Sequence, residues 1–394
     1  MNAFRRLLDD ERGMVMAISL LILALLIGVG VGAIVSTQTD LKTSGNLLTG
    51  TQAFYLAEAG VEWGKNKIKN TAANPPGPST ETLRLPPGRF TVSFLAPTKI
   101  DNLLAAVTVR STALVGSSSS TVQARVAKTY ELSDAAVSLR GNESHPSFVG
   151  TSFLVDGRDY DPVTGALVPG APAQFGISVA NETLEGQVEG GLSNTQKDNI
   201  AGKGGTLPNV EKSGFLPPEV IGQMVDELCN DPRARVADMP ITGTLLVSGN
   251  TTWGTRISPE LHCIRGSGSQ PGDKVDIGGS FTGVGILAVR DADLEVSGVF
   301  HWEGLILVSG THVGFRVEGG ENKDIFGSVM VNERGWDTGA GTEEIKLQGA
   351  AAVRYSRSAL QRAAQLFPLT ALEVIYGSVP STVTQSYWRE EIAE

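Results

Sequence analysis

The chain opens with a strongly apolar segment. No charged side chain occurs from Met14 to Val35. A helix needs about 20 apolar residues to cross the hydrocarbon core of a bilayer. The pattern therefore predicts a membrane-spanning helix over residues 14–36.

The apolar pattern continues beyond this span at helical spacing. Leu41, Leu48 and Tyr55 recur every seven residues, which is typical of one face of a helix. The segment 74–78 is rich in proline, and proline blocks helix continuation. We expect the same helix to run on over residues 37–73.

A different period follows. Apolar residues alternate with polar ones, as expected of strands with one buried face, and they include Phe90, Val92, Phe94, Val107, Val109, Val122, Ala124 and Val126. We therefore predict three or four antiparallel strands over residues 85–132. Their apolar face should pack on the helix.

Residues 134–394 contain a repeat. Similar runs begin at Gly243, Gly285, Gly304, Gly327 and Gly349, and the differences between successive starts are 42, 19, 23 and 22. The first difference, 42, corresponds to two repeats, and the segment 262–266 supplies the repeat between them. The repeat unit is therefore about 21 residues long, within the range of solenoid repeats. Second strands lie between the runs, as in the segment 293–298.

A fixed period near 20 with glycine corners is typical of stacked coils. We predict a short β-helix over residues 134–394, with a β-sandwich as the alternative. Helical segments near residues 217–229 and 358–367 are candidates to cap its ends. The predicted fold class is α+β and mostly β, with a long N-terminal helix, a small antiparallel sheet and a large glycine-rich β domain.

Composition, charge and the absence of known motifs argue against several classes of function. Apolar residues make up 41% and charged residues 19%, which argues against a disordered chain. The net charge of −10 repels phosphate backbones, so nucleic acid is not expected as the main partner. The sequence has no nucleophile elbow, P-loop or His-Glu-x-x-His motif. We expect a protein that is not an enzyme and holds no cofactor.

Two groups of residues resemble metal sites. Asp156, Asp159 and Asp161 have the close spacing of a calcium loop but lack the glycine and glutamate of an EF-hand. An ordinary aspartate-rich turn is the favoured interpretation and calcium the alternative. His301, Glu303 and His312 lie on adjacent predicted strands, and His301 and Glu303 share a face. A solvated strand face is the favoured interpretation and a metal site the alternative.

The two cysteines are Cys229 and Cys263. One pair suits a single bridge in an oxidising compartment. We predict a disulfide that closes a loop of about 34 residues and contributes about 3–4 kcal/mol. Two buried free thiols are the alternative.

The leader carries the motif of a known export signal. Glu11-Arg12-Gly13 stands directly before the long apolar helix, and this arrangement resembles a prepilin signal sequence. The resemblance implies a leader at residues 1–13, cleavage after Gly13 by a prepilin peptidase, and Met14 as the N-methylated first residue. An ordinary signal-anchored protein is the plainer alternative.

The segment after the span extends the resemblance. Residues 53–60 read AFYLAEAG, and with the span they are similar to the PilX-type minor pilins of type IV pilus assembly over about residues 11–65. Major pilins carry glutamate at the fifth residue after the cut, where this chain has Ile18. That departure favours a minor or tip subunit over a shaft subunit.

This resemblance implies a structural subunit that helps to start or tip a type IV pilus and displays its β domain, with adhesion as one role of that domain. Its partners would be major and minor pilins through the helix, inner-membrane lipid before assembly, and the peptidase. Arg5, Arg6 and Arg12 precede the span and Lys42 follows it, which favours a cytoplasmic N-terminus, a periplasmic body and later an extracellular pilus.

Two other functions stay open from the sequence. A minor pseudopilin of type II secretion would share the same helix. A membrane-anchored carbohydrate-active β-helix enzyme would need acids clustered along one face of the coils, and the repeat has few at matched positions.

Overall fold

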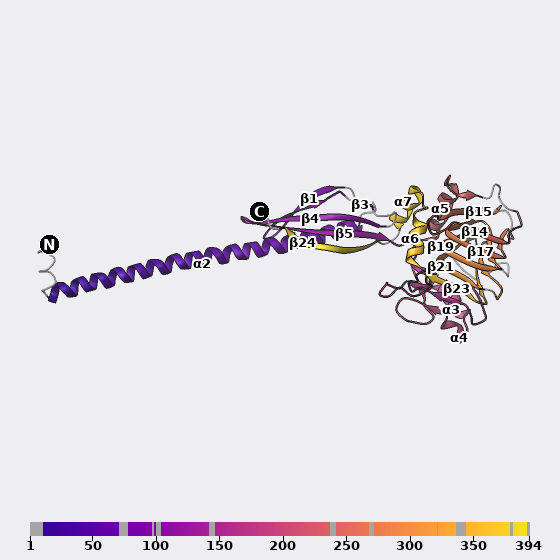
Figure 1. The fold of residues 1–394 in the computed structure, drawn as a ribbon, viewed down its shortest axis with the longest axis horizontal. Helices are drawn as coiled ribbons and strands as arrows, with labels where there is room; N and C mark the ends of the chain where they lie inside the picture. The colour runs from indigo at the N-terminus through magenta and orange to yellow at the C-terminus, as the bar shows by residue number, and fades with distance from the viewer. Residues whose placement is uncertain are drawn as a thin grey trace.

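One long helix dominates the N-terminal part of the chain. The computed structural model describes residues 11–70, 78–96, 98–99, 104–141, 146–236, 242–267, 272–320, 322–335, 344–378 and 381–391. Helix α2 (Glu11–Asn70) is a single 60-residue element. Its first half projects alone from the body of the molecule (Figure 1), which confirms the predicted long helix.

The second half of α2 packs on an antiparallel sheet, as predicted. Its first strands are β1 (Ser79–Leu85), β2 (Gly88–Phe94), β3 (Thr98–Lys99), β4 (Leu104–Val115) and β5 (Ser118–Tyr130). Ala57 and Val61 of the helix share one buried cluster with Val92 and Val109 of the strands. Gly60 permits this close approach, because a Cβ there would lie 2.1 Å from Ser111 Oγ.

The C-terminal strand returns to this sheet. Strand β24 (Ser381–Glu391) pairs antiparallel with β5, which gives the order β1-β2-β4-β5-β24. We call these strands the pilin-like sheet, after the pilin resemblance of the N-terminal segment. The large β domain is therefore an insertion between two neighbouring strands of the pilin-like sheet. The predicted boundary of 134–394 is wrong at its end, because residues 381–391 belong to the sheet.

The inserted domain is built from parallel ladders. One six-stranded sheet contains β13 (Thr244–Val247), β16 (Lys274–Ile277), β18 (Asp293–Val296), β20 (Phe315–Val317), β22 (Ile345–Gln348) and β7 (Ser147–Val149), all parallel. Successive coils thus stack on one another, as in the predicted β-helix. Antiparallel sheets, which a β-sandwich would need, do not occur in the described part of this domain.

The second sheet follows the same coils. Its path contains β10 (Ile200–Ala201), β8 (Leu154–Asp156), β23 (Ala351–Tyr355), β21 (Lys323–Gly335), β19 (Val299–Thr311), β17 (Ser280–Arg290), β15 (Glu260–Arg265) and β12 (Arg235–Val236). Further strands join it at its sides: β14 (Asn250–Trp253), β6 (Ala135–Leu139), β9 (Phe175–Val179) and β11 (Val210–Lys212). Strand β6 follows the pilin-like sheet closely in sequence, so the two domains meet there.

A stack of glycines bends the long strands. Gly285, Gly304 and Gly327 lie in register with φ of +136°, +135° and +143°. A Cβ on Gly304 would lie 2.0 Å from the Gly285 carbonyl oxygen. The bend therefore requires glycine in these three central coils, while Glu260 and Tyr355 occupy the same level in the coils on either side.

Two of the predicted repeat positions are out of register. The run that begins at Gly243 lies in the other sheet, where β13 pairs with β16, and the residue level with Gly285 is Glu260. Gly349 precedes β23 and would place a Cβ against Gly319. Several coils carry glycines at two different corners, and sequence spacing alone does not show to which corner a given glycine belongs.

Helices cover the side of the solenoid. They are α5 (Pro218–Asn230), α6 (Arg357–Ala364) and α7 (Leu369–Ser378), while α3 (Glu182–Gly190) and α4 (Asn194–Lys197) lie in the preceding segment. Both α5 and α6 contact β17, β19 and β21, so they cross several coils instead of capping an end. The predicted helices exist, but their predicted role as end caps is wrong.

Candidate assembly helix and interdomain junction

The projecting half of α2 is apolar and exposed. Leu21 and Leu26 are both 63% exposed and Val29 is 65% exposed. By length and composition the helix Met14–Asn70 contains a segment that could cross a membrane. Apolar surface of this extent is unfavourable in water, so the segment needs lipid or other helices around it.

Three hydroxyl groups of this half form hydrogen bonds within the helix itself. The hydroxyls of Ser19, Thr37 and Thr39 donate to the carbonyl four residues earlier, at 2.8, 2.8 and 2.9 Å. Ile18 is half exposed on the same helix, and the first charged residue after Gly13 is Asp40. The segment can therefore be transferred from lipid to a bundle of packed helices without transferring a charged side chain.

The predicted cleavage site lies at the start of the helix. The backbone of Gly13 and Met14 continues α2, while leader residues 1–10 lie outside the described residues. Cleavage after Gly13 and methylation of Met14 stay predictions.

Near the pilin-like sheet the helix borders a hollow of about 600 Å³. Tyr55 and Glu62 of α2 and Trp388 of β24 line it. Tyr55 is 63% and Trp388 43% exposed, and the Trp388 ring packs edge-on against Phe54 at 6.0 Å. These aromatic side chains extend the exposed apolar surface of α2 towards the body.

The two cysteines are bonded, which confirms the predicted disulfide. Their Cα atoms are 5.3 Å apart, and both residues are buried. Cys229 lies in α5 and Cys263 in β15. The bond therefore fastens the covering helix to the solenoid.

The structure gives each carboxylate of the predicted calcium loop its own protein partners. Asp156 accepts hydrogen bonds from Arg158 Nε at 2.9 Å and from the Tyr160 hydroxyl at 2.7 Å. Burial raises the pKa of Asp156, but these hydrogen bonds outweigh it and the net pKa is lowered.

Asp159 and Asp161 have other donors. Asp159 accepts from the Arg357 backbone at 2.9 Å, and Asp161 accepts from the Val163 backbone at 2.8 Å. Across the described ranges, no three His, Cys, Asp or Glu side chains are grouped so that they could hold a metal ion. The calcium prediction for Asp156, Asp159 and Asp161 thus finds no support in the geometry.

The second candidate metal group is an ion-pair cluster. Glu303 is 2% exposed and accepts from Arg256 Nε at 2.9 Å, Arg362 Nη2 at 2.8 Å and His301 Nε2 at 3.2 Å. Burial alone would raise the pKa of Glu303, but the hydrogen bonds from His301 and Arg256 and the charges of Arg256 and Arg362 lower it to about 2. The carboxylate therefore pairs α6 and the loop at Arg256 with β19.

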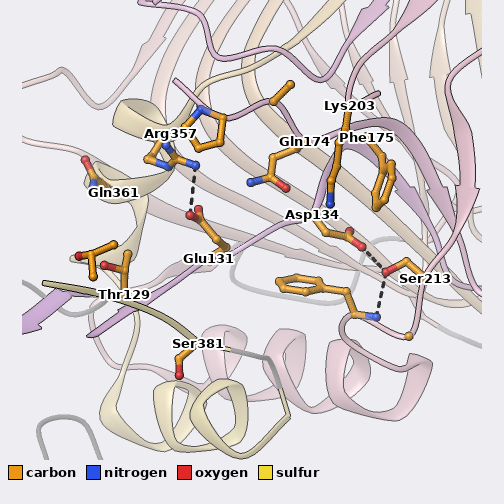
Figure 2. A pocket seen from close by; sticks show the side chains of 15 residues that line it. Thr129, Glu131, Asp134, Gln174, Phe175, Lys203, Ser213, Arg357, Gln361 and Ser381 are labelled. Carbon is orange, nitrogen blue, oxygen red and sulfur yellow. Dashed lines mark hydrogen bonds and ion pairs between the residues drawn. The ribbon is translucent and has the colours of Figure 1, made fainter. Parts of the chain in front are cut away.

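A cavity of about 910 Å³ lies where the two domains meet, and sequence reasoning did not anticipate it. Figure 2 shows Arg357 of α6 turned towards Glu131, which follows β5, and Asp134 turned towards Ser213. The Arg357 to Glu131 ion pair measures 3.2 Å. Glu131 also accepts from the Tyr355 hydroxyl at 3.1 Å.

A second set of contacts continues inward from the cavity. Arg140 is 1% exposed and donates to Asp134 at 3.1 Å and to Ser178 at 2.9 Å. Ser213 donates to Asp134 as well. A buried charge is costly without its partner, so breaking the pair of Arg140 with Asp134 would be unfavourable. These polar contacts therefore hold the chain in place where it passes from the sheet into the solenoid.

Comparison with known proteins supports the N-terminal assignment. Residues 12–62 match the family model described as PilX N-terminal. Among solved structures, the competence-associated pilin ComZ from Thermus thermophilus is similar at 13% identity and a TM-score of 0.31, with 87% of this chain and 98% of that chain covered. No curated protein matches this chain.

The matched segment contains the apolar span and the AFYLAEAG motif, and it ends where α2 packs on the sheet. The resemblance predicted from these residues is therefore confirmed. The N-terminal segment over residues 12–62 is therefore of the PilX type found in type IV pilin-like proteins.

Proposed function

We propose that this chain is a minor pilin that occupies the tip of a type IV pilus and presents its β domain to the surroundings. The observation that carries the proposal is the position of the β domain. It lies at the end of the molecule opposite the projecting half of α2, beyond the pilin-like sheet (Figure 1). It is also inserted between β5 and β24.

This position affects assembly. In a filament held together by packed α2 helices, subunits follow one another along the direction of the helix. The β domain of this chain continues the long axis of the molecule and is wider than the sheet (Figure 1). Within the shaft, this domain would occupy the space of the next subunit. At the tip no further subunit follows, so the domain has room.

The character of the apolar helix supports the same role. Leu21, Leu26 and Val29 offer packing surface on the projecting half, and the span has no acid at Ile18. Before assembly we expect this helix to lie in the inner membrane after leader removal, with the body in the periplasm. We infer a structural and not a catalytic role, with adhesion as a task for the β domain.

Labelling of filaments tests the proposal. A tag in the exposed loop at Gly165, which has φ of +68° and no atom within 4 Å of a Cβ, should place gold particles at filament ends. A tag on the major pilin serves as the control and should label the whole shaft. Regular labelling of this chain along the shaft would overturn the tip position.

A further inference from the structure

The face of the pilin-like sheet turned away from α2 carries five arginines, which we call the arginine face. Residues of a strand point alternately to its two sides, and Val92, Val109 and Ala124 point towards α2. The opposite positions include Arg84 on β1, Arg89 on β2, Arg110 on β4, Arg125 on β5 and Arg389 on β24, all exposed.

The strand register brings three of these arginines together. Arg110 lies opposite Gln123, and Gln123 lies opposite Arg389. Arg125 is two residues from Gln123 on the same strand. With strands about 4.8 Å apart and alternate residues about 6.8 Å apart, the three Cα atoms lie within about 10 Å of one another.

The other two arginines form a second group. Arg84 lies opposite Arg89 at the hairpin between β1 and β2. Like charges directly opposite one another disfavour a sheet, so this placement is not explained by stability.

Hydroxyl groups cover the area between the two groups. Thr82 and Thr91 lie 2.9 Å apart, and Thr112 and Thr121 lie 3.0 Å apart, each pair joined by a hydrogen bond across two strands. Short side chains of this kind leave the face flat and leave the longer arginines as its most prominent groups.

Acidic residues are scarce on this face. Among the described strands, the outward positions from Thr80 to Arg389 hold no Asp or Glu. Glu81 alternates to the helix side, where it pairs with Lys67, and Glu390 also alternates to that side. Glu391, the last residue of β24, lies opposite Thr121 and is the one acid at an outward position of these strands.

The two domains therefore differ in charge. Residues 79–130 contain six Lys or Arg and two Asp or Glu, whereas residues 134–378 contain 18 and 30. The acidic total that argued against nucleic acid belongs to the inserted domain. The pilin-like sheet itself carries more basic than acidic residues.

We propose that the arginine face binds the phosphate backbone of duplex DNA. Alternate residues of a strand are spaced about 6.8 Å apart, and two successive nucleotides rise by about the same distance along the helix axis. Arginine forks suit phosphate oxygens and threonine hydroxyls add donors. Uronic-acid polysaccharides carry fewer charges per unit length, so they match five closely set arginines less well.

The aromatic content of the face favours a duplex over a single strand. Tyr387, opposite Arg125, is 45% exposed, and the Arg389 guanidinium lies 5.7 Å from its ring centre. Binding of single strands depends on several stacking platforms, and this face offers one. Contact should therefore be with the backbone and independent of base sequence.

Placement of the face on the filament exterior rests on the proposed function, because α2 would occupy the filament core. Binding itself does not, since it is measured on the isolated chain. Failure of DNA binding with normal pilus incorporation would remove only this inference, and binding without incorporation would remove only the proposed function.

The test uses the full chain in neutral detergent and a fluorescent 20-base-pair duplex, with anisotropy measured from 50 to 200 mM salt. For about four phosphate contacts the slope of log K against log salt should be about −3.6, which is a loss of about 150-fold over this range. The variant with Arg110→Gln, Arg125→Gln and Arg389→Gln should bind at least 10-fold more weakly at 50 mM salt, and its slope should be smaller by about 2 to 3.

The matched control removes three exposed positive charges from the β domain through Lys203→Gln, Lys212→Gln and Arg235→Gln. It should leave affinity and slope unchanged. Arg110→Gln alone, which changes one exposed side chain, should reduce the slope by about 1. Equal weakening by the control, no binding by the wild type at 50 mM salt, or tighter binding of polygalacturonate than of DNA would each overturn the inference.

Discussion

Ser381 pairs with Tyr130 across two antiparallel strands, so the chain leaves the pilin-like sheet and returns to it at neighbouring points. The solenoid and its covering helices lie entirely between these two residues. A body that is closed in this way does not need the insertion to complete its sheet. The insertion instead enlarges one end of the molecule.

Removal of the insertion tests this arrangement. We expect a chain in which residues 134–378 are replaced by a short Gly-Ser linker to keep the packing of α2 on the sheet, because the closing ends are already adjacent. Circular dichroism and a cooperative thermal transition would show a folded body. Aggregation of this chain, with the isolated solenoid folding alone, would contradict the closed body.

The glycine stack predicts a large cost for one added methyl group. Gly304→Ala would place a Cβ 2.0 Å from the Gly285 carbonyl oxygen at a φ of +135°. We expect a loss of about 2–4 kcal/mol in the free energy of unfolding, measured with urea.

Gly186→Ala is its control, since Gly186 lies in α3 with no atom within 4 Å of a Cβ. It should stabilise slightly, by about 0.5–1 kcal/mol. Equal effects of the two substitutions would show that the stack is not what requires glycine.

Glu303 predicts a dependence of stability on acid pH. Its folded pKa of about 2 lies below the ordinary value of 4.5, so its stabilising contribution is complete above about pH 4.5 and is lost as pH falls towards 2. Glu303→Gln should cost about 2–3 kcal/mol at pH 7, less than a fully buried pair because Arg256 and Arg362 are partly exposed. Unfolding measured from pH 6 to pH 2 should show this cost shrinking.

Glu182→Gln gives the comparison for that series. Glu182 pairs with Lys212 at the surface, where ion pairs contribute little. Its removal should leave stability nearly unchanged at every pH. A Glu303→Gln cost that stays constant down to pH 2 would contradict the low pKa.

The disulfide predicts sensitivity to reduction. The double variant Cys229→Ser, Cys263→Ser should lose about 3–4 kcal/mol, because the bond closes a loop of 34 residues. Reductant should lower the thermal midpoint of the wild type and leave that of the double variant unchanged. A wild-type midpoint indifferent to complete reduction would be inconsistent with a stabilising bond.

Part of the fold can be predicted from the sequence because it depends on local periodicity. The uncharged run at 14–35 and the alternation around Phe90 each follow one element's own pattern. The recurring glycine runs were sufficient to predict stacked coils, although their spacing did not distinguish the corner at Gly349 from that at Gly327.

The features that sequence reasoning missed depend on long-range pairing. Strand β24 contains mostly exposed residues, so it has no alternating apolar pattern to reveal that it joins β5. The junction cavity and the arginine face need the register of strands far apart in sequence, such as Arg110 with Gln123 and Gln123 with Arg389. Charge averaged over the chain conceals such a face.

We infer that the uncharged half of α2 holds the subunit among its neighbours in the filament. Leu25 is 60% exposed in that half, and an arginine there costs about 2.5–3.5 kcal/mol in an apolar surrounding. The decisive measurement is the amount of Leu25→Arg protein in sheared pili relative to wild type. Thr91→Arg, at a partly exposed position of the sheet, serves as the control. We expect Leu25→Arg to be absent from pili while Thr91→Arg is incorporated normally. Incorporation of Leu25→Arg at the wild-type level would show that this half of α2 does not hold the subunit in the filament.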